Sequence, residues 1–391
     1  ARDGEDLAAI VKDAVLARLV ADRKVGLLLS GGIDSSLILS VLCAEGLANR
    51  VSCFTGDAGK SDDAIYARRC IEQLGINHIN VPLDYGSASI ERFLQVCRHQ
   101  EKPFPFIGNA LAMPQLYARI ADHDVPVVLD GAGGDEIFAG YWYRYYRFAI
   151  AEAMAAGDES WLADSLAAND DDIKIRAMAA QAVRDTRPGS RSASSRPGIV
   201  GATDDPADLD MFVRSSVREA RSSDPLECYR GTLAEALVTD AAHGRLHEWL
   251  WQNDRNAMMS GIENRSPFLD YRLAPFMHSG YRKKFVGAWN KHELRSLFSA
   301  FVPLPTQWRR DKQGFRWVYS RFLRHNRNQV LELIASSRVL RELVDVDRLL
   351  QRACRHDNYL ASSLMERMLC IAGLEQTMGL SATETSAVKV A

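Results

Sequence analysis

The stretch "VGLLLSGGIDSSLILSVLCAEG", residues 25–46, decides the fold of this chain. Residues 25–30 form a short apolar run that stops at the pair Gly31-Gly32, which is typical of a buried strand that ends in a tight turn. The residues after the turn predict a helix that is closed by Gly46. We therefore expect a strand, a glycine turn and a helix in this order.

The same alternation of strand and helix continues on both sides of this stretch. The predicted strands lie at 25–30, 50–56, 77–84 and 125–131, and the predicted helices at 5–21, 35–46, 62–75, 87–99 and 109–121. These strand segments are continuously apolar, which is typical of parallel strands covered on both faces. The predicted fold class is α/β, with a parallel sheet of about five strands and helices on both faces.

The second half of the chain has a different pattern. After about Tyr141 the strand signals fade, and residues 142–183 and 206–380 predict helices. Residues 184–206, "RDTRPGSRSASSRPGIVGATDDP", predict a mobile insertion because they combine Arg, Ser, Pro and Gly with few apolar residues. The arginines of this insertion have no interleaved aromatic residues on which bases could stack, so we interpret it as a solvated loop.

These patterns divide the chain into four predicted parts. They are an N-terminal helix at 1–21, an α/β core at 22–145, a helical part at 146–380 that carries the insertion, and a flexible tail at 381–391. No internal repeat is visible. The mostly helical C-terminal part therefore follows a compact α/β core.

Composition limits the classes of function. The chain has 391 residues, of which 47% are hydrophobic and 25% charged, and its net charge of −2 argues against binding nucleic acid or membranes through bulk charge. No apolar run approaches the length of a membrane span, and the N-terminal residues lack a signal-peptide core. The seven cysteines are scattered without a CxxC pair, so we expect reduced thiols and a cytoplasmic location.

The glycine turn has the chemistry of an anion site. Glycines let backbone N–H groups approach a ligand, and the N-terminus of the following helix adds a positive dipole end, which together suit phosphate. The candidate nucleotide ligands in this turn are Ser30, Gly31, Gly32, Asp34, Ser35 and Ser36. Asp34 has the wrong sign for phosphate unless Mg²⁺ lies between them. The alternative is a plain strand–helix turn in which Asp34 or Ser35 caps the helix.

A second loop places more acids at the same edge of the predicted sheet. In "VVLDGAGGDEIFAGY", residues 127–141, Asp135 and Glu136 follow a strand end and a glycine-rich turn. Ligands of open α/β sheets bind beyond the carboxyl ends of the strands, so Asp34 and Asp135 can together hold Mg²⁺ on a pyrophosphate. The alternative is that Asp135 and Glu136 cap the start of a helix.

Several blocks carry a resemblance to a known family. The loop "SGGIDSS" (30–36) resembles the pyrophosphate loop (PP-loop) of the ATP pyrophosphatases, and five further blocks resemble, in order and spacing, the synthetase half of asparagine synthetase over about residues 5–325. These blocks are "HQEKPF" (99–104), "VVLDGAGGDEIFAGY" (127–141), "NDRNAMMSGIENRSPFLDYRL" (253–273), "NKHELR" (290–295) and "WRRDKQGF" (308–315). The resemblance implies the PP-loop ATP pyrophosphatase fold for the α/β core.

The resemblance also implies roles for individual residues. Leu28, Thr55 and Gly131 line up with the adenine and ribose surface of the family, and Lys291 and Lys312 with its lysines near the phosphates. A lysine there stabilises the developing pyrophosphate or tetrahedral intermediate as a point charge, and Lys312 is the stronger candidate of the two. The predicted catalytic residues are Lys312, Lys291 and Glu136.

The chemistry that the resemblance implies is amide formation driven by ATP and Mg²⁺. A substrate carboxylate attacks the α-phosphate and becomes an acyl-adenylate while pyrophosphate leaves, and an amine or ammonia then displaces AMP. The default carboxylate is aspartate, and a small-molecule or peptide acid is the other option. The chain starts at Ala1 and its first cysteine is Cys43, so the family's glutaminase domain, with its N-terminal cysteine nucleophile, is absent from the sequence. The sequence leaves open a fragment, a separate glutaminase, or direct use of ammonia or another amine.

Ala132 is the main departure from the family's pattern. Asparagine synthetases usually carry an acid at this point of the glycine loop, where it assists deprotonation of ammonia, whereas alanine cannot move a proton. Glu136 or Glu101 is a hypothetical substitute, and Lys102 replaces another common acid. The block at 253–273 is open between a substrate role and a buried ion-pair network formed by its charged residues, Asp254, Arg255, Glu263 and Arg265.

The sequence also leaves open other functions of the same fold. They include a β-lactam-synthetase-like or lasso-peptide-cyclase-like ligase, amidation of a uronic acid, a tRNA-modifying ATP pyrophosphatase, and an inactive nucleotide-binding scaffold. The net charge and the lack of a cysteine cluster disfavour the tRNA-modifying class, and the retained Asp34, Asp135 and Lys312 count against an inactive scaffold. The sequence is compatible with a homodimer but does not determine the oligomeric state.

Overall fold

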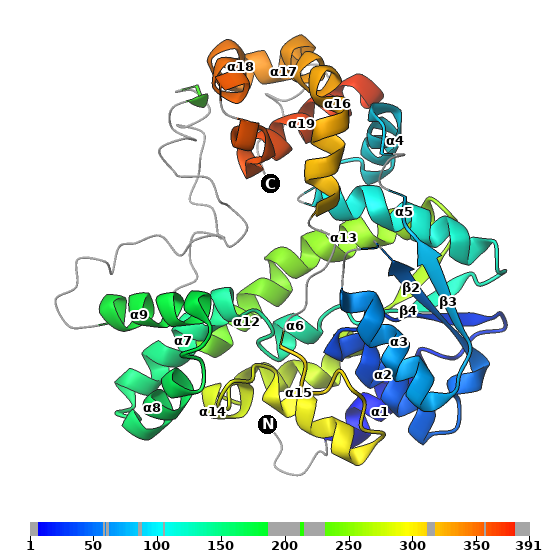
Figure 1. Ribbon diagram of the computed structural model, residues 1–391, viewed down its shortest axis with the longest axis vertical. Coiled ribbons are helices and arrows are strands. Elements are labelled where there is room, and N and C mark those ends of the chain that lie inside the picture. Colours follow the sequence, from blue (N-terminus) through cyan, green and yellow to red (C-terminus); the bar gives the residue numbers. More distant parts are fainter. Residues whose placement is uncertain are drawn as a thin grey trace.

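The computed structural model describes residues 7–57, 59, 62–84, 88–104, 106–186, 212–214, 231–310, 317–355 and 357–379. Its centre is a five-stranded parallel sheet with the order β3-β2-β1-β4-β5 (Figure 1). The strands are β1 (Val25–Leu28), β2 (Val51–Asp57), β3 (His78–Pro82), β4 (Val127–Leu129) and β5 (Glu263–Arg265). The predicted α/β class with a parallel sheet of about five strands is confirmed.

The first four strands occur where the apolar runs predicted them. Parallel pairing aligns Val25 with Val51 on one side and with Val127 on the other, so β1 lies at the centre of the sheet. The helices between these strands are α2 (Ile33–Ala44), α3 (Asp62–Leu74), α4 (Ile90–Gln100) and α5 (Ile107–Ala121), preceded by α1 (Leu7–Ala17). Strand and helix therefore alternate as expected.

The fifth strand corrects the prediction that residues 206–380 are helical. β5 pairs with β4 in parallel, with Val127 opposite Glu263 and Leu129 opposite Arg265. The strand has only three residues, all polar, and its side chains are exposed or half-buried. It lies at the edge of the sheet and lacks the apolar run by which a buried strand is recognised in a sequence.

Two apolar cores cover the two faces of the sheet. Leu27, Leu29 and Cys53 belong to the core that contains buried residues of α1, α2 and α3. Phe54 and Val128 point to the opposite core, which contains buried residues of α4 and α5. Side chains of one strand alternate between the faces, so each short strand contributes to both cores.

The C-terminal part is mostly helical, as the sequence predicts. After the short helix α6 (Gly134–Ile137), the helices on the side of the first core are α7 (Trp142–Ala155), α8 (Glu159–Ala167), α9 (Ile173–Thr186), α12 (Leu233–Ala242), α14 (Tyr281–Lys284) and α15 (His292–Ser296). On the side of the second core lie α13 (Arg245–Met258), α16 (Trp317–Ser336), α17 (Arg338–Leu343), α18 (Val346–Arg355) and α19 (Ser363–Met378). In Figure 1, α16 to α19 form one end of the molecule, and α7, α8 and α9 lie together away from the sheet. Short 3-10 helices occupy 48–50, 267–269, 271–278, 297–300 and 357–361.

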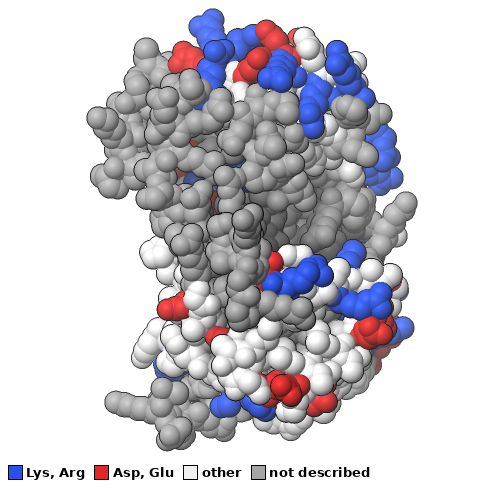
Figure 2. Space-filling model, turned by 90° about the vertical axis from the view of Figure 1, so that its left-hand side faces the viewer, with Lys and Arg blue, Asp and Glu red and all other residues white. Residues whose placement is uncertain are grey.

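Most of the predicted insertion and the whole predicted tail, residues 187–206 and 381–391, lie outside the described residues. No described helix has both the length and the apolar character needed to span a membrane. Figure 2 shows Lys and Arg beside Asp and Glu at the end formed by the C-terminal helices, where Arg341 pairs with Asp347 at 3.3 Å. Charges of both signs are therefore mixed on this surface.

Candidate active site

The order of the strands defines a crevice between β1 and β4. From β1 the chain runs to β2 and β3 on one side, and it returns to β4 and β5 on the other. This reversal is a topological switch point, where the loops after neighbouring strands separate and leave room for a ligand. The loop after β1 carries Ser30 to Gly32, and the loop after β4 carries Asp130 to Gly133. The predicted nucleotide residues of both loops therefore meet at one place.

The loop after β1 is folded by its serines and by Gly31. The backbone N–H of Ser30 donates to Ser35 Oγ at 3.1 Å, and that of Gly32 donates to Ser30 Oγ at 3.3 Å. Gly31 has a φ of +68°, a left-handed conformation that glycine adopts without strain. Helix α2 begins after Gly32, and no side chain caps it. The alternative that Asp34 or Ser35 caps this helix is therefore wrong.

Arg309, which is not among the residues predicted from the sequence, holds this loop from outside. Its guanidinium donates to the carbonyl oxygen of Gly31 at 2.9 Å and to Asp63 Oδ1 at 2.5 Å, and it stacks over the ring of Tyr66 at 4.3 Å. The side chain is almost fully buried. Arg309 therefore fixes the left-handed turn at Gly31 against the start of α3. Arg309 lies in the block "WRRDKQGF". Only the resemblance of this block to the family, and no local sequence pattern, could have pointed to Arg309 as a site residue.

Replacing Gly31 with alanine should strongly weaken nucleotide binding. A Cβ at this position would meet the backbone oxygen of Asp63 and lie 2.9 Å from the backbone nitrogen of Ala67, so the loop must shift. We expect ATP binding, measured by calorimetric titration, to weaken by at least about 100-fold, because a shift of about 1 Å misplaces the predicted anion site.

Gly46→Ala is the matched control for this prediction. Gly46 also has a φ of +68°, but nothing lies within 4 Å of an added Cβ. It should lose about 1 kcal/mol of stability through the left-handed conformation and retain ATP affinity. Equal loss of affinity in both variants would show that backbone strain, and not the contact with α3, decides the effect.

Two predicted carboxylates and one predicted lysine meet in the crevice. Lys291 Nζ lies 2.6 Å from Asp34 Oδ1 and 2.6 Å from Asp135 Oδ1. The side chains of Lys291 and Asp34 are 2% and 6% exposed, so these charges are held away from bulk water. The conformation of Lys291 is left-handed, with a φ of +50°, which is uncommon for a residue with a Cβ and typical of functional sites.

The segment that carries Lys291 is fastened by Asn290 and Arg295. Asn290 Nδ2 donates to the carbonyl oxygen of Gly140, and Arg295 donates to the backbone oxygens of Asn290 and Gln307 at 2.8 and 2.6 Å. Burial lowers the pKa of Arg295 to about 10, while the negative charges of Asp34 and Asp135 oppose this shift. Arg295 therefore adds a second buried positive charge close to the carboxylates. Arg295 lies in the block "NKHELR", where no local sequence pattern marks it as a site residue.

Asp34 and Asp135 provide a donor set that fits Mg²⁺. Carboxylate oxygens are the ligands that this ion prefers, and nucleotide-bound Mg²⁺ usually takes one or two carboxylates and completes its shell with phosphate and water. Among the residues that the structure describes, no group of three or more His, Cys, Asp or Glu side chains could hold a metal alone. An ion bound by Asp34 and Asp135 would therefore take its other ligands from water or from a bound molecule.

Glu136 is buried beside this cluster. It belongs to α6, which begins after Gly133 without a side-chain cap, so the alternative that Asp135 and Glu136 cap this helix is wrong. Tyr141 Oη donates to Glu136 Oε1 at 3.2 Å. Burial, and after it the charge of Asp135, raises the pKa of Glu136 to about 7, while Lys291 opposes the shift. The carboxyl group is therefore poised to exchange a proton near neutral pH.

The raised pKa of Glu136 predicts a pH-dependent stability. A group whose pKa is about 7 when folded and 4.5 when unfolded stabilises the fold fully below pH 4.5, and this contribution is lost as the pH rises to about 7. The loss amounts to at most about 3 kcal/mol. In urea unfolding in Mg²⁺-free buffer, Glu136→Gln should lose less stability than the wild type between about pH 5 and about pH 8. The same change at the exposed Glu332 is the control, and identical slopes for all three proteins would contradict the prediction.

The predicted adenine and ribose surface lies along the same edge of the sheet. Leu28 is half-buried at the end of β1, and Gly131 is half-buried in the turn after β4. Thr55 is buried, and its hydroxyl donates to the carbonyl oxygen of Leu29 at 2.6 Å. Ser36 is fully buried on α2. The cofactor roles of these residues stay predictions.

Of the other charged residues that the sequence suggests for the site, those that the structure describes are not found in the cluster around Lys291. Lys312 lies outside the described residues. Glu101 pairs with Arg255 at 2.9 Å, and Lys102 pairs with Glu248 at 3.1 Å, all with partly exposed side chains. In the block at 253–273, Arg265 pairs with Glu263 at 2.9 Å, with Glu263 largely exposed. The hypothesis of a buried ion-pair network in this block is therefore wrong.

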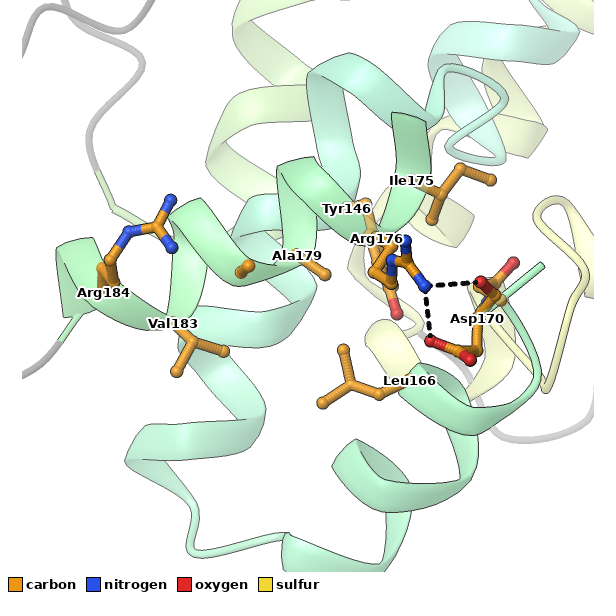
Figure 3. A pocket seen from close by; sticks show the side chains of 10 residues that line it. Tyr146, Leu166, Asp170, Ile175, Arg176, Ala179, Val183 and Arg184 are labelled. Carbon is orange, nitrogen blue, oxygen red and sulfur yellow. Dashed lines mark hydrogen bonds and ion pairs between the residues drawn. The ribbon is translucent and has the colours of Figure 1, made fainter. Parts of the chain in front are cut away.

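One cavity lies away from this site, among α7, α8 and α9 (Figure 3). It measures about 420 Å³, and Leu166, Ile175 and Val183 line it with apolar surface, whereas Arg176 donates to the Oδ1 and the backbone oxygen of Asp170 at 3.3 Å. None of its lining residues is a predicted site residue. This cavity therefore contributes nothing to the chemistry of the crevice.

The fold and the site define a class: α/β proteins with a glycine-rich loop and two convergent carboxylates at the switch point of a parallel sheet. The model of the asparagine synthase family matches residues 6–377. The chain therefore belongs to the asparagine synthase family, and the resemblance found in the sequence is confirmed.

Similar curated proteins come from several organisms. Amidase chry2 of Gibberella zeae is 25% identical over 74% of this chain and 49% of its own length. Amidase chyE of Penicillium rubens is 27% identical over 68% of this chain and 44% of its length. Asparagine synthetase [glutamine-hydrolyzing] 2 of Bacillus subtilis is 22% identical over 87% of this chain and 43% of its length. The chain spans half or less of these relatives.

Proposed function

We propose that this protein is an ATP-dependent amide ligase that forms AMP and pyrophosphate. The observation that carries the proposal is the convergence of Asp34 and Asp135 on Lys291 Nζ, each at 2.6 Å, at the switch point of the sheet. Two acids and a lysine beside a glycine loop suit the transfer of an adenylyl group, which needs positioning and charge stabilisation more than covalent chemistry by the protein.

In the first step, a substrate carboxylate attacks the α-phosphate of ATP. An oxygen–phosphorus bond forms, the bond between the α- and β-phosphates breaks, and pyrophosphate leaves with the electron pair. The loop from Ser30 to Gly32 and the uncapped start of α2 bind the phosphates, and Lys291 stabilises the charge that develops on the leaving group. Asp34 and Asp135 would hold Mg²⁺, which would neutralise charge on the phosphates. Lys312 is proposed as a second lysine near the phosphates.

In the second step, an amine attacks the acyl carbon, and AMP leaves. The attacking nitrogen must lose protons, and Glu136 is proposed as one acceptor because it is buried with a pKa of about 7. Glu101 has less support, since it is exposed and paired with Arg255. Leu28, Thr55 and Gly131 are proposed to bind the adenosine.

The carboxylate substrate is aspartate by default, and a specialised acid is the alternative. The alanine at position 132, where asparagine synthetases usually carry an acid, favours a specialised acid. A small-molecule acid, a peptide side chain and a uronic acid all belong to this group. Ammonia or an organic amine would be the second substrate, with a separate glutaminase as one source of ammonia.

An ATP–pyrophosphate exchange screen over carboxylic acids tests the proposal. We expect exchange of labelled pyrophosphate into ATP that depends on Mg²⁺ and on one class of acid. Exchange with aspartate alone would assign asparagine synthesis, whereas exchange with another acid alone would assign a specialised ligase. Absence of exchange with every acid tested would contradict the proposed function and favour a nucleotide-binding scaffold.

The six described cysteines are free, which supports the proposed cytoplasmic location.

A further inference from the structure

A second cavity opens beside the nucleotide loop, at the carboxyl ends of β4 and β5. It measures about 370 Å³, and its lining includes Arg18, Asp130, Leu250, Asp254, Arg265 and Leu269. The turn after β4 joins it to the nucleotide side: Asp130 lines the cavity, while a Cβ on the next residue, Gly131, would lie 2.6 Å from Asp34 Cβ and 3.1 Å from Ser35 N. One short turn therefore separates the two spaces.

Asp130 is the central polar group of this cavity. It is 7% exposed, and three donors hold its carboxylate: Ser266 Oγ at 2.5 Å, Asn253 Nδ2 at 2.8 Å and the backbone N–H of Ala132 at 3.1 Å. Tyr117 Oη donates in turn to Asn253 Oδ1 at 2.8 Å, which orients that amide. The geometry of the carboxylate is therefore fixed by three different elements, as a group that binds a ligand requires.

The charges around the cavity favour a cation. Asp254 is exposed at its rim, so two carboxylates line one space. Of the two lining arginines, Arg18 binds Asp270 Oδ2 at 2.7 Å, and Arg265 binds Glu263 Oε1 at 2.9 Å. The arginines are thus neutralised by acids that do not line the cavity, whereas Asp130 is bound only by uncharged donors in the described contacts.

The geometry points to this cavity as the subsite for the second substrate: it binds an organic primary amine in its ammonium form, and Asp130 accepts the first proton. The assignment rests on the proposed function. A volume of about 370 Å³ is larger than ammonia requires and suits an amine with an organic side chain. Leu250 and Leu269 provide the apolar wall for that side chain.

Proton balance explains why a second acceptor is needed. An ammonium group loses two protons on its way to an amide nitrogen. The first goes to Asp130 and frees the lone pair, which forms the C–N bond while the bond from the acyl carbon to AMP breaks and AMP keeps its electron pair. The second leaves the nitrogen after attack, and Glu136, on the nucleotide side of the turn, is the acceptor proposed above.

The groups that face Asp130 set its pH dependence. Burial raises the pKa of Asp130, whereas the hydrogen bonds from Ser266, Ala132 and Asn253 oppose the shift. The other titratable or charged groups around it are Tyr117 from α5, Asp254 from α13, Arg265 from β5 and Arg18 after α1. Burial also raises the pKa of Tyr117, so its phenol stays neutral as a donor. Removing Asp130 should therefore change the acidic limb of the pH profile for amide formation.

Separate assays of the two half-reactions test this inference. For Asp130→Asn, we expect ATP–pyrophosphate exchange within about threefold of the wild type, but kcat/KM for the amine lower by at least about 100-fold, with the acidic limb of the pH profile lost. Asp254→Asn should raise KM for the amine and leave kcat unchanged. Equal loss of exchange and amide formation in Asp130→Asn would overturn the inference, as would unchanged amine kinetics.

Direct binding gives a readout that does not depend on the proposed function. n-Propylammonium should bind the wild-type protein in calorimetric titration near neutral pH, the uncharged n-propanol should not, and Asp130→Asn should lose the binding. Leu250→Trp, which fills the cavity and leaves Asp130 intact, should block binding but keep exchange, which covers the case in which Asp130→Asn fails to fold. Equal binding of the amine and the alcohol, or binding retained in both variants, would overturn the subsite. Absence of exchange in the wild type together with amine binding would instead reject the proposed function.

Discussion

Replacing Lys291 with methionine should reduce ATP–pyrophosphate exchange by at least about 1,000-fold. Lys291 Nζ is shared by Asp34 and Asp135, and the side chain is 2% exposed. The variant loses the charge proposed to stabilise the leaving pyrophosphate, and it also leaves two carboxylates unpaired in a poorly solvated crevice. Breaking a buried pair in this way costs about 3–5 kcal/mol of stability. Exchange assays and urea unfolding measure the two effects separately.

Lys284→Met provides the matched control. Lys284 is also fully buried, and it binds Glu293 Oε2 at 2.9 Å and the carbonyl oxygen of Phe276 at 2.7 Å. This variant should lose a similar amount of stability, yet it should retain exchange at a temperature at which it is folded, because no residue of the proposed site contacts Lys284 Nζ in the described structure. If both lysine variants lost exchange in proportion to their stability, Lys291 would be structural and not catalytic.

The local part of the site could be predicted from the sequence because its signals are contiguous. An apolar run followed by Gly31-Gly32 specifies a strand end and a turn, and parallel strands bring such turns to one edge of the sheet. This was enough to place Asp34 and Asp135 together. It could not reveal that Lys291 lies between them, since Lys291 follows Asp34 by 257 residues and contacts it only through the tertiary fold.

Other residues of the site could not be predicted for the same reason: their contacts form only in the tertiary fold. Arg309 and Arg295 act on backbone carbonyls, such as that of Gly31, and a carbonyl leaves no trace in a sequence. β5 was missed because its three polar residues gain their strand conformation by pairing with β4. Asp130 directly precedes the glycines of its turn, but its partners come from α13 and from the residue after β5, so only the structure reveals the cavity.

Asp34→Asn and Asp135→Asn should each reduce exchange by at least about 1,000-fold, and the double variant should lose little more than either alone. The two carboxylates contact one cation in the structure, and they are proposed to hold one Mg²⁺ with the phosphates. The effects of substituting residues that act as one unit are not additive, because removal of either residue already disables the unit. The measurement is exchange as a function of Mg²⁺ concentration, in which the single variants should require more Mg²⁺.

Stability should respond in a different way, and this separates a metal role from a structural one. Each single substitution leaves Lys291 with its other carboxylate, so the loss of stability should stay below that of Lys291→Met. Asp57→Asn is the control at the same edge of the sheet: its carboxylate accepts hydrogen bonds from Asn80 and from the backbone N–H of Gly59, and it has no described contact with Lys291. Exchange in this variant should stay within about tenfold of the wild type with an unchanged Mg²⁺ requirement. Additive losses in the double variant, or an unchanged Mg²⁺ requirement in both single variants, would mean that the carboxylates only position Lys291.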